Sequence, residues 1–118
     1  MLICICKANS YIKTKGDFIM YEHTLFIGMN DKDTHKQELS LDEFKKRIAN
    51  TLGDCTIKEG ATGYYTHDNG VKVIEKSLEV TKFGGTKRSI VNLAKQLKQT
   101  LNQESIILKT QVSKSDFI

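Results

Sequence analysis

Residues 56–83, TIKEGATGYYTHDNGVKVIEKSLEVTKF, have the pattern of two β-strands joined by a tight turn. Asn69-Gly70 stands at the centre of this stretch. Asn-Gly is the strongest short signal for a two-residue hairpin, because both central turn residues need a positive φ. The sequence therefore predicts a hairpin with strands over Thr56–His67 and Val71–Phe83.

Two features predict that this hairpin is irregular. Gly60 and Gly63 interrupt the first strand, and glycine inside a strand marks a bulge or a close approach of backbone. In the second strand, Val71 and Val73 alternate in one phase, while Ile74, Leu78 and Val80 alternate in the other. This change of phase predicts a second bulge near Ile74.

A helix is predicted before the hairpin. Ser40-Leu41-Asp42-Glu43 forms a capping box, in which the serine caps the helix and Glu43 reaches back to it. Leu41, Phe44, Ile48 and Leu52 then recur at helical spacing, and Gly53 ends the helix.

The elements before and after this helix and hairpin complete a repeated β-strand and helix pattern. Tyr21–Met29 contains a short buried strand, Leu25–Ile27. After the hairpin come a helix with an apolar stripe over residues 90–101 and a last strand over Ser105–Val112. The order is βαββαβ, and right-handed crossovers make it a ferredoxin-like α+β sandwich, with an antiparallel sheet and two helices on one face.

The length of 118 residues fits one domain with a single modest core. We expect an α+β domain over residues 20–118, preceded by an extension over residues 1–19 that adds a strand or an arm. The other sheet face would lack a covering layer. An apolar set on the hairpin strands predicts that a second copy covers it, giving a homo-oligomer: Tyr64, Tyr65, Val71, Val73 and Phe83.

Composition limits the compartment and the partners. Hydrophobic residues make up 39% and charged residues 27%, as in ordinary globular domains. No apolar run is long enough to span a membrane, and the apolar start is too short for a signal peptide. Cys4, Cys6 and Cys55 suit buried reduced thiols. We therefore expect a cytoplasmic protein.

The positive charge is concentrated in one stretch. Between Val80 and Gln103 there are five basic residues and no carboxylate, whereas the rest has 13 basic against 14 acidic residues. Gly84-Gly85 opens a helix there, where backbone N–H groups and the helix N-terminus favour an anion. The spacing is not that of a P-loop. A solvated helix cap made by Thr86 or Ser89 is the alternative.

The predicted ligand site follows from this charge argument. Thr86, Lys87 and Arg88 would meet phosphates with the backbone of Gly84 and Gly85. The full predicted set of ligand-binding residues is Phe83, Gly84, Gly85, Thr86, Lys87, Arg88, Asn92, Lys109 and Asp116. A net charge of +4 falls short of a duplex nucleic-acid binder.

No catalytic set is predicted. His67 with Glu59 or Glu75 could act as an acid–base pair across the strands, and Cys55 with His67 could form a nucleophile pair. The favoured interpretation is that His67 is a surface histidine and that Cys55 is a buried thiol. Asn30-Asp31-Lys32-Asp33 lacks the glycine and glutamate of a calcium loop. We expect no metal and no cofactor.

Two resemblances add to this interpretation. Leu25-Phe26-Ile27-Gly28, the hairpin and Asn102-Gln103-Glu104-Ser105-Ile106 resemble a bacterial family of small ferredoxin-like domains of unknown function. Thr24–Asp33, with the same hairpin and last strand, looks like phage-borne Thoeris anti-defence proteins of the first type. That resemblance implies an oligomeric sponge that sequesters cyclic ADP-ribose isomers, and in some members cyclic oligonucleotides, without cleaving them.

The expected function is therefore non-catalytic sequestration of a cyclic nucleotide messenger in the host cell cytoplasm, countering anti-phage signalling. The alternative is a phage-type protein-interaction module that inhibits a host protein through its exposed sheet face.

Overall fold

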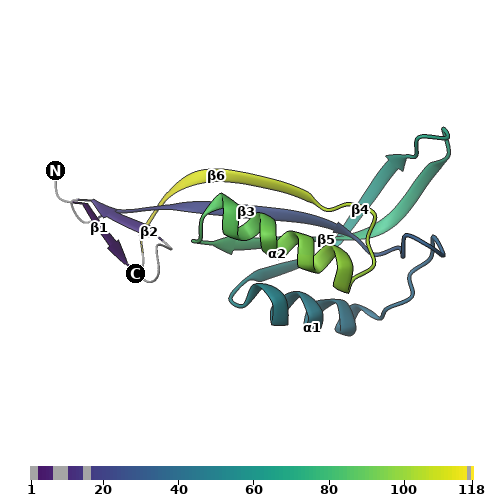
Figure 1. Ribbon diagram of the computed structural model, residues 1–118, viewed down its shortest axis with the longest axis horizontal. Helices are drawn as coiled ribbons and strands as arrows, with labels where there is room; N and C mark the ends of the chain where they lie inside the picture. Colours follow the sequence, from purple (N-terminus) through teal and green to yellow (C-terminus); the bar gives the residue numbers. More distant parts are fainter. Residues whose placement is uncertain (1–2, 7–10, 15–16, 117) are drawn as a thin grey trace.

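The computed structural model describes residues 3–6, 11–14, 17–116 and 118, shown as a ribbon in Figure 1. Their elements follow one another as β1 (Ile3–Cys6), β2 (Tyr11–Thr14), β3 (Asp17–Gly28), α1 (Leu41–Leu52), β4 (Thr56–Thr66), β5 (Lys72–Phe83), α2 (Lys87–Thr100) and β6 (Ile107–Ser115).

The central sheet has the topology predicted from the sequence. The order of the strands across the sheet is β4-β5-β3-β6, and each neighbouring pair is antiparallel. The first and last strands of the βαββαβ unit, β3 and β6, therefore lie side by side, as right-handed crossovers require. The ferredoxin-like α+β fold is confirmed.

Two short strands extend this sheet at the end where the chain begins. β1 pairs with β2, and β2 pairs with Asp17–Met20 at the start of β3. β5 pairs with β3 only from Glu22 onward, so β2 occupies the same edge of β3 beyond the end of β5. The extension predicted over residues 1–19 contains these two strands.

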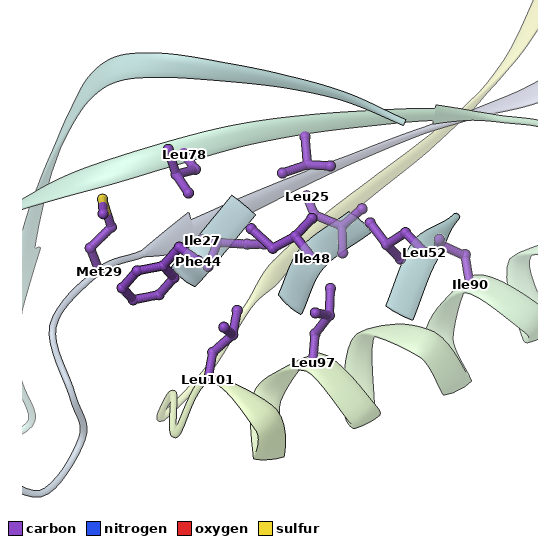
Figure 2. Packing of buried hydrophobic residues seen from close by; sticks show 11 residues of the cluster. Leu25, Ile27, Met29, Phe44, Ile48, Leu52, Leu78, Ile90, Leu97 and Leu101 are labelled. Atoms are coloured by element: carbon purple, nitrogen blue, oxygen red, sulfur yellow. The ribbon is translucent and has the colours of Figure 1, made fainter. Parts of the chain in front are cut away.

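Both helices cover one face of the sheet, and the core lies between the two layers (Figure 2). Burying each large apolar side chain there contributes about 1.5–3 kcal/mol. The buried cluster is Leu25, Ile27, Met29, Phe44, Ile48, Leu52, Leu78, Val80, Ile90, Leu97 and Leu101. Among the residues that the structure describes, no helix combines the length and apolar character that a membrane crossing requires.

The start of α1 differs in one detail from the predicted capping box. Ser40 caps the helix, because its hydroxyl accepts a hydrogen bond from the Glu43 N–H at 3.1 Å. The Glu43 carboxylate does not reach back; it accepts a bond from Arg47 Nε at 2.9 Å, one turn further on. An ion pair along the helix takes the place of the reciprocal cap bond.

The hairpin has one bulge, in β4. The register with β5 shifts between Lys58 and Ala61, and Gly60 has a φ of 85° there. The prediction from Gly60 is confirmed, and the prediction of a bulge near Ile74 is wrong, because β5 pairs in unbroken register from Lys72 to Ser77. The apparent change of phase has another cause: both faces of β5 carry apolar residues.

Alternation along the strands assigns the side chains to two faces. Leu78 and Val80 face the helices, and so does Ile74 on the same strand. Tyr64 lies opposite Ile74, and these two are 74% and 67% exposed because the hairpin projects past both helices (Figure 1). The prediction that Tyr64 shares the uncovered face with Tyr65 is therefore wrong. We call the uncovered face the open face.

Candidate functional site

A hollow lies on the open face where β3 ends and the hairpin begins to project. It encloses a cavity of about 260 Å³, near the lower end of the range of small-molecule sites, about 300–1,000 Å³. A wider hollow adjoins it and shares His35 and His67 with it. The cavity is lined by Phe26, Gly28, Asn30, Asp31, Lys32, His35, Tyr65, Thr66, His67, Asp68, Val73, Glu75, Gln103, Glu104, Ser105 and Ile107.

Glu75 is held in a fixed place in this cavity. Its carboxylate accepts a hydrogen bond from the Asn30 N–H at 2.9 Å. It lies directly over Gly28, where a Cβ would come within 2.3 Å of Oε1. The backbone of Gly28 needs no positive φ, so glycine is required there for space. The end of β3 thus provides both the room and the donor that position this carboxylate.

The loop after β3 is held against the segment between α2 and β6 by two amide side chains. Gln103 is buried and donates through Nε2 to the Asn30 carbonyl at 3.0 Å. Asn102 donates through Nδ2 to Asp31 at 2.8 Å and to Asp33 at 2.9 Å. These bonds fix the wall of the cavity that carries Asp31.

The Asp31 carboxylate is stabilised in its charged form. The Asn102 amide, and then the backbone N–H of Asp33, lower its pKa below the ordinary value. A group whose pKa is lower in the folded state stabilises the fold above its unfolded pKa of about 3.9. That contribution is lost as the pH falls through the folded pKa.

Asn102→Gly should make the free energy of unfolding less dependent on pH in the acid range. Glycine suits the positive φ of 49° at this position and removes only the amide. With the pKa of Asp31 returned toward its ordinary value, the unfolding free energy should fall less steeply below about pH 4. Chemical denaturation at several pH values, with an NMR titration of Asp31, measures this. An unchanged Asp31 titration would contradict the role given to Asn102.

His67 pairs with a different carboxylate from those considered in the sequence. His67 Nδ1 lies 3.7 Å from Glu104 Oε2, and the His67 ring meets the His35 ring edge-on at 5.8 Å. Glu59 instead forms an ion pair with Lys45. The structure does not show the alternative pairing of His67 with Glu59 or Glu75, although His67 and Glu75 line the same cavity.

The cavity is acidic. Its lining holds four carboxylates (Asp31, Asp68, Glu75, Glu104) and one lysine (Lys32), which is a net charge of −3 with neutral histidines. Such a cavity attracts a cationic ligand and repels a phosphate.

Within the part of the chain that the structure describes, no group of three or more histidine, cysteine or carboxylate side chains is arranged to hold a metal ion.

The predicted anion site lies elsewhere, at the start of α2. Thr86 caps the helix by accepting from the Ser89 N–H at 3.1 Å, and the Ser89 hydroxyl donates to the Thr86 carbonyl at 2.9 Å. Both hydroxyls are therefore engaged in the helix cap that was the alternative interpretation. Buried His23 holds the preceding loop, with Nε2 donating to the Gly85 carbonyl at 3.0 Å.

The other predicted ligand residues do not all converge on this cap. Phe83 and Lys109 lie on the open face of the sheet, whereas Asn92 is exposed on α2, on the opposite side. Lys87 and Arg88 are exposed in the first turn of α2, and Asp116 follows the end of β6. Phe83 pairs with Glu22, four residues or about 13 Å along β3 from Phe26, the nearest β3 residue that lines the acidic cavity. Anion binding at this set stays a prediction.

The acidic cavity itself was missed in the sequence, apart from Glu75 and His67. A signal was present on the hairpin. Gly63 and Tyr65 in the first strand, and Glu75 and Ser77 in the second, are each two residues apart, so each pair shares a face. Polar and small residues on one face of a sheet are unusual for a core and indicate a face that the helices do not cover.

Comparison with known proteins identifies a shared fold. No protein-family model matches the sequence, and no curated protein matches it. Two solved structures of a phage SAM lyase do match. The apo form has a TM-score of 0.60 and 20% sequence identity, over 82% of this chain and 89% of that one. The complex with S-methyl-5′-thioadenosine has a TM-score of 0.58 and 22% identity, over 88% of this chain and 92% of that one.

These findings correct the functional expectations from sequence. The resemblance to the Thoeris anti-defence sponges is wrong, because the two structures described above, which match this fold over most of its length, are of a phage SAM lyase. The expectations of a non-enzymatic protein, and of sequestration or host-protein inhibition as its function, are corrected with it. The ligand seen in one of those lyases is derived from adenosine and carries no phosphate, unlike the predicted cyclic nucleotide.

Proposed function

We propose that this protein is an S-adenosylmethionine (SAM) lyase that releases S-methyl-5′-thioadenosine (MTA). The observation that carries the proposal is the acidic cavity around Glu75, on a fold shared with SAM lyases. SAM bears a sulfonium, an α-ammonium and a carboxylate group, so its net charge is +1. A cavity of net charge −3 complements that cation.

The bond broken joins the sulfonium sulfur to Cγ of the amino-acid portion. The substrate carboxylate attacks Cγ, the C–O bond forms, and the electron pair of the C–S bond stays on sulfur. The products are neutral MTA and homoserine lactone, which keeps its ammonium group. This step balances without water, proton transfer or an oxidant. The protein must mainly fold the substrate so that carboxylate and Cγ meet in line.

Charge changes during this step indicate a role for Glu75. The sulfonium and the carboxylate both lose their charge in the transition state, so an anion beside sulfur would stabilise the substrate more than the transition state. The α-ammonium keeps its charge throughout. We therefore assign the fixed carboxylate of Glu75 to the α-ammonium, which orients the amino-acid portion without opposing the reaction.

Homo-oligomerisation belongs to the same proposal. The cavity opens onto the open face, where Phe83 and Ile107 are exposed by 52% and 55%. A second copy packed on this face would bury these side chains and exclude water from the substrate.

The test is turnover of SAM by the purified protein. Chromatography with mass spectrometry should show MTA and the four-carbon product formed in equal amounts, faster than in buffer alone. In ¹⁸O-labelled water the earliest four-carbon product should carry no label, because its ring oxygen comes from the substrate carboxylate. Label in that earliest product would indicate hydrolysis and contradict the lyase step.

A further inference from the structure

Beside Glu75, a row of small residues crosses three neighbouring strands on the open face. Ser77 on β5 pairs with Gly28 on β3 and with Ala61 on β4. Gly63, two residues after Ala61, lies opposite Glu75. The side chains on this part of the sheet are therefore short or missing, so the surface is flat. We call it the platform: Gly28, Ala61, Gly63 and Ser77.

Two longer side chains fold over this platform. Glu75 covers Gly28, as described above. Tyr65 folds back over Gly63, where a Cβ would come within 2.5 Å of its ring and 2.7 Å of its hydroxyl. Tyr65, Glu75 and Gly28 all line the acidic cavity, so the platform adjoins that cavity.

Ser77 is the unexplained group in this arrangement. The residue is 7% exposed, and its hydroxyl is buried without a hydrogen-bond partner among the residues that the structure describes. The hydroxyl lies 2.8 Å from the position of a Cβ on Gly63, so it points into the space that Tyr65 fills. An unpartnered buried hydroxyl destabilises a fold, and alanine would avoid that cost at the same volume.

We propose that the platform binds the adenine ring of the ligand and that Ser77 Oγ hydrogen-bonds the ring edge. This inference rests on the proposed function and specifies where the base lies. Gly63 already accommodates one aromatic ring, that of Tyr65. When Tyr65 turns outward, a flat base can take its place on the glycine floor and stack against the displaced phenol. The amino-acid portion of SAM then extends over Glu75 into the acidic cavity.

Ser77→Ala tests this proposal because its two effects have opposite signs. The variant should unfold at the same or a higher temperature, since it loses an unpartnered buried hydroxyl. It should bind MTA about tenfold more weakly, a difference of about 1.4 kcal/mol. Ser113→Ala is the matched control: it lies on the same face, its hydroxyl is paired with Ser115, and it does not line the cavity. Its MTA affinity should equal that of the wild type.

Adenine alone shows which part of the ligand Ser77 contacts. NMR titration of wild type and Ser77→Ala with MTA and with free adenine should give the same relative loss for both. Unchanged MTA affinity in Ser77→Ala, or a loss for MTA without a loss for adenine, would overturn the platform. A wild-type protein that binds both ligands but leaves SAM intact would overturn the proposed lyase activity and leave the platform standing.

Discussion

Glu75→Gln is expected to lower kcat/KM for SAM cleavage by about 100-fold, which corresponds to about 2.7 kcal/mol of transition-state binding. Glutamine keeps the shape and still accepts the Asn30 hydrogen bond, so only the charge is lost. Removing the charged partner of a buried ammonium typically costs about 2–5 kcal/mol. The measurement is the initial rate of MTA formation at several SAM concentrations.

Glu79→Gln is the matched control for this variant. Glu79 lies on the same face of β5 as Glu75, four residues further along the strand. It does not line the cavity. Its kcat/KM should stay within about twofold of the wild type, and both variants should keep the unfolding free energy within about 1 kcal/mol. Equal rates for Glu75→Gln and the wild type would contradict the role assigned to Glu75.

Gly28→Ala should reduce SAM cleavage more than tenfold without adding or removing a charge. An alanine Cβ would meet Glu75 Oε1 at 2.3 Å, so the carboxylate must leave its place and its bond to the Asn30 N–H. Gly28 has an ordinary strand backbone without a positive φ. Alanine loses less conformational entropy than glycine when a strand forms, so the substitution does not strain the backbone. Displacement of Glu75 is therefore the main expected consequence, and thermal unfolding measures whether the fold persists.

The double variant separates this displacement from a general disturbance of the sheet. Two changes that act on the same carboxylate are not additive. A Cβ on Gly28 meets the side chain at position 75, and the proposed place of the base is over Gly63, so Gly28→Ala in the Glu75→Gln background should lower kcat/KM little further. A full additional tenfold loss would show that Gly28 acts on catalysis by some route other than Glu75.

The sequence was sufficient to predict the fold because its local signals agree with one another. The Asn69-Gly70 turn, the Ser40 cap and the apolar stripes of both helices all point to the same βαββαβ order, which the structure shows. The prediction of a bulge near Ile74 was wrong because apolar residues occur on both faces of β5. Sequence alone does not show that the hairpin extends past the helices, leaving Tyr64 and Ile74 exposed.

The candidate site was harder to predict, because its parts are distant in the chain. The cavity joins the end of β3, the hairpin and the start of the last strand, and the side chain that covers Gly28 comes from Glu75, 47 positions later. The charge argument instead drew attention to Lys87 and Arg88, whose charges stand out because no carboxylate is near them in sequence. In the structure, carboxylates from separate segments gather into an acidic cavity that no single stretch of sequence reveals.

The measurement that tests the central claim most directly is the amount of MTA that the wild-type protein forms from SAM, followed against Glu75→Gln and a buffer blank. The account predicts one MTA for each SAM consumed, many turnovers for each protein molecule, and, at SAM concentrations well below KM, a rate about 100-fold lower in the variant. Formation of MTA at the rate of the blank, by a folded wild-type protein, would contradict it.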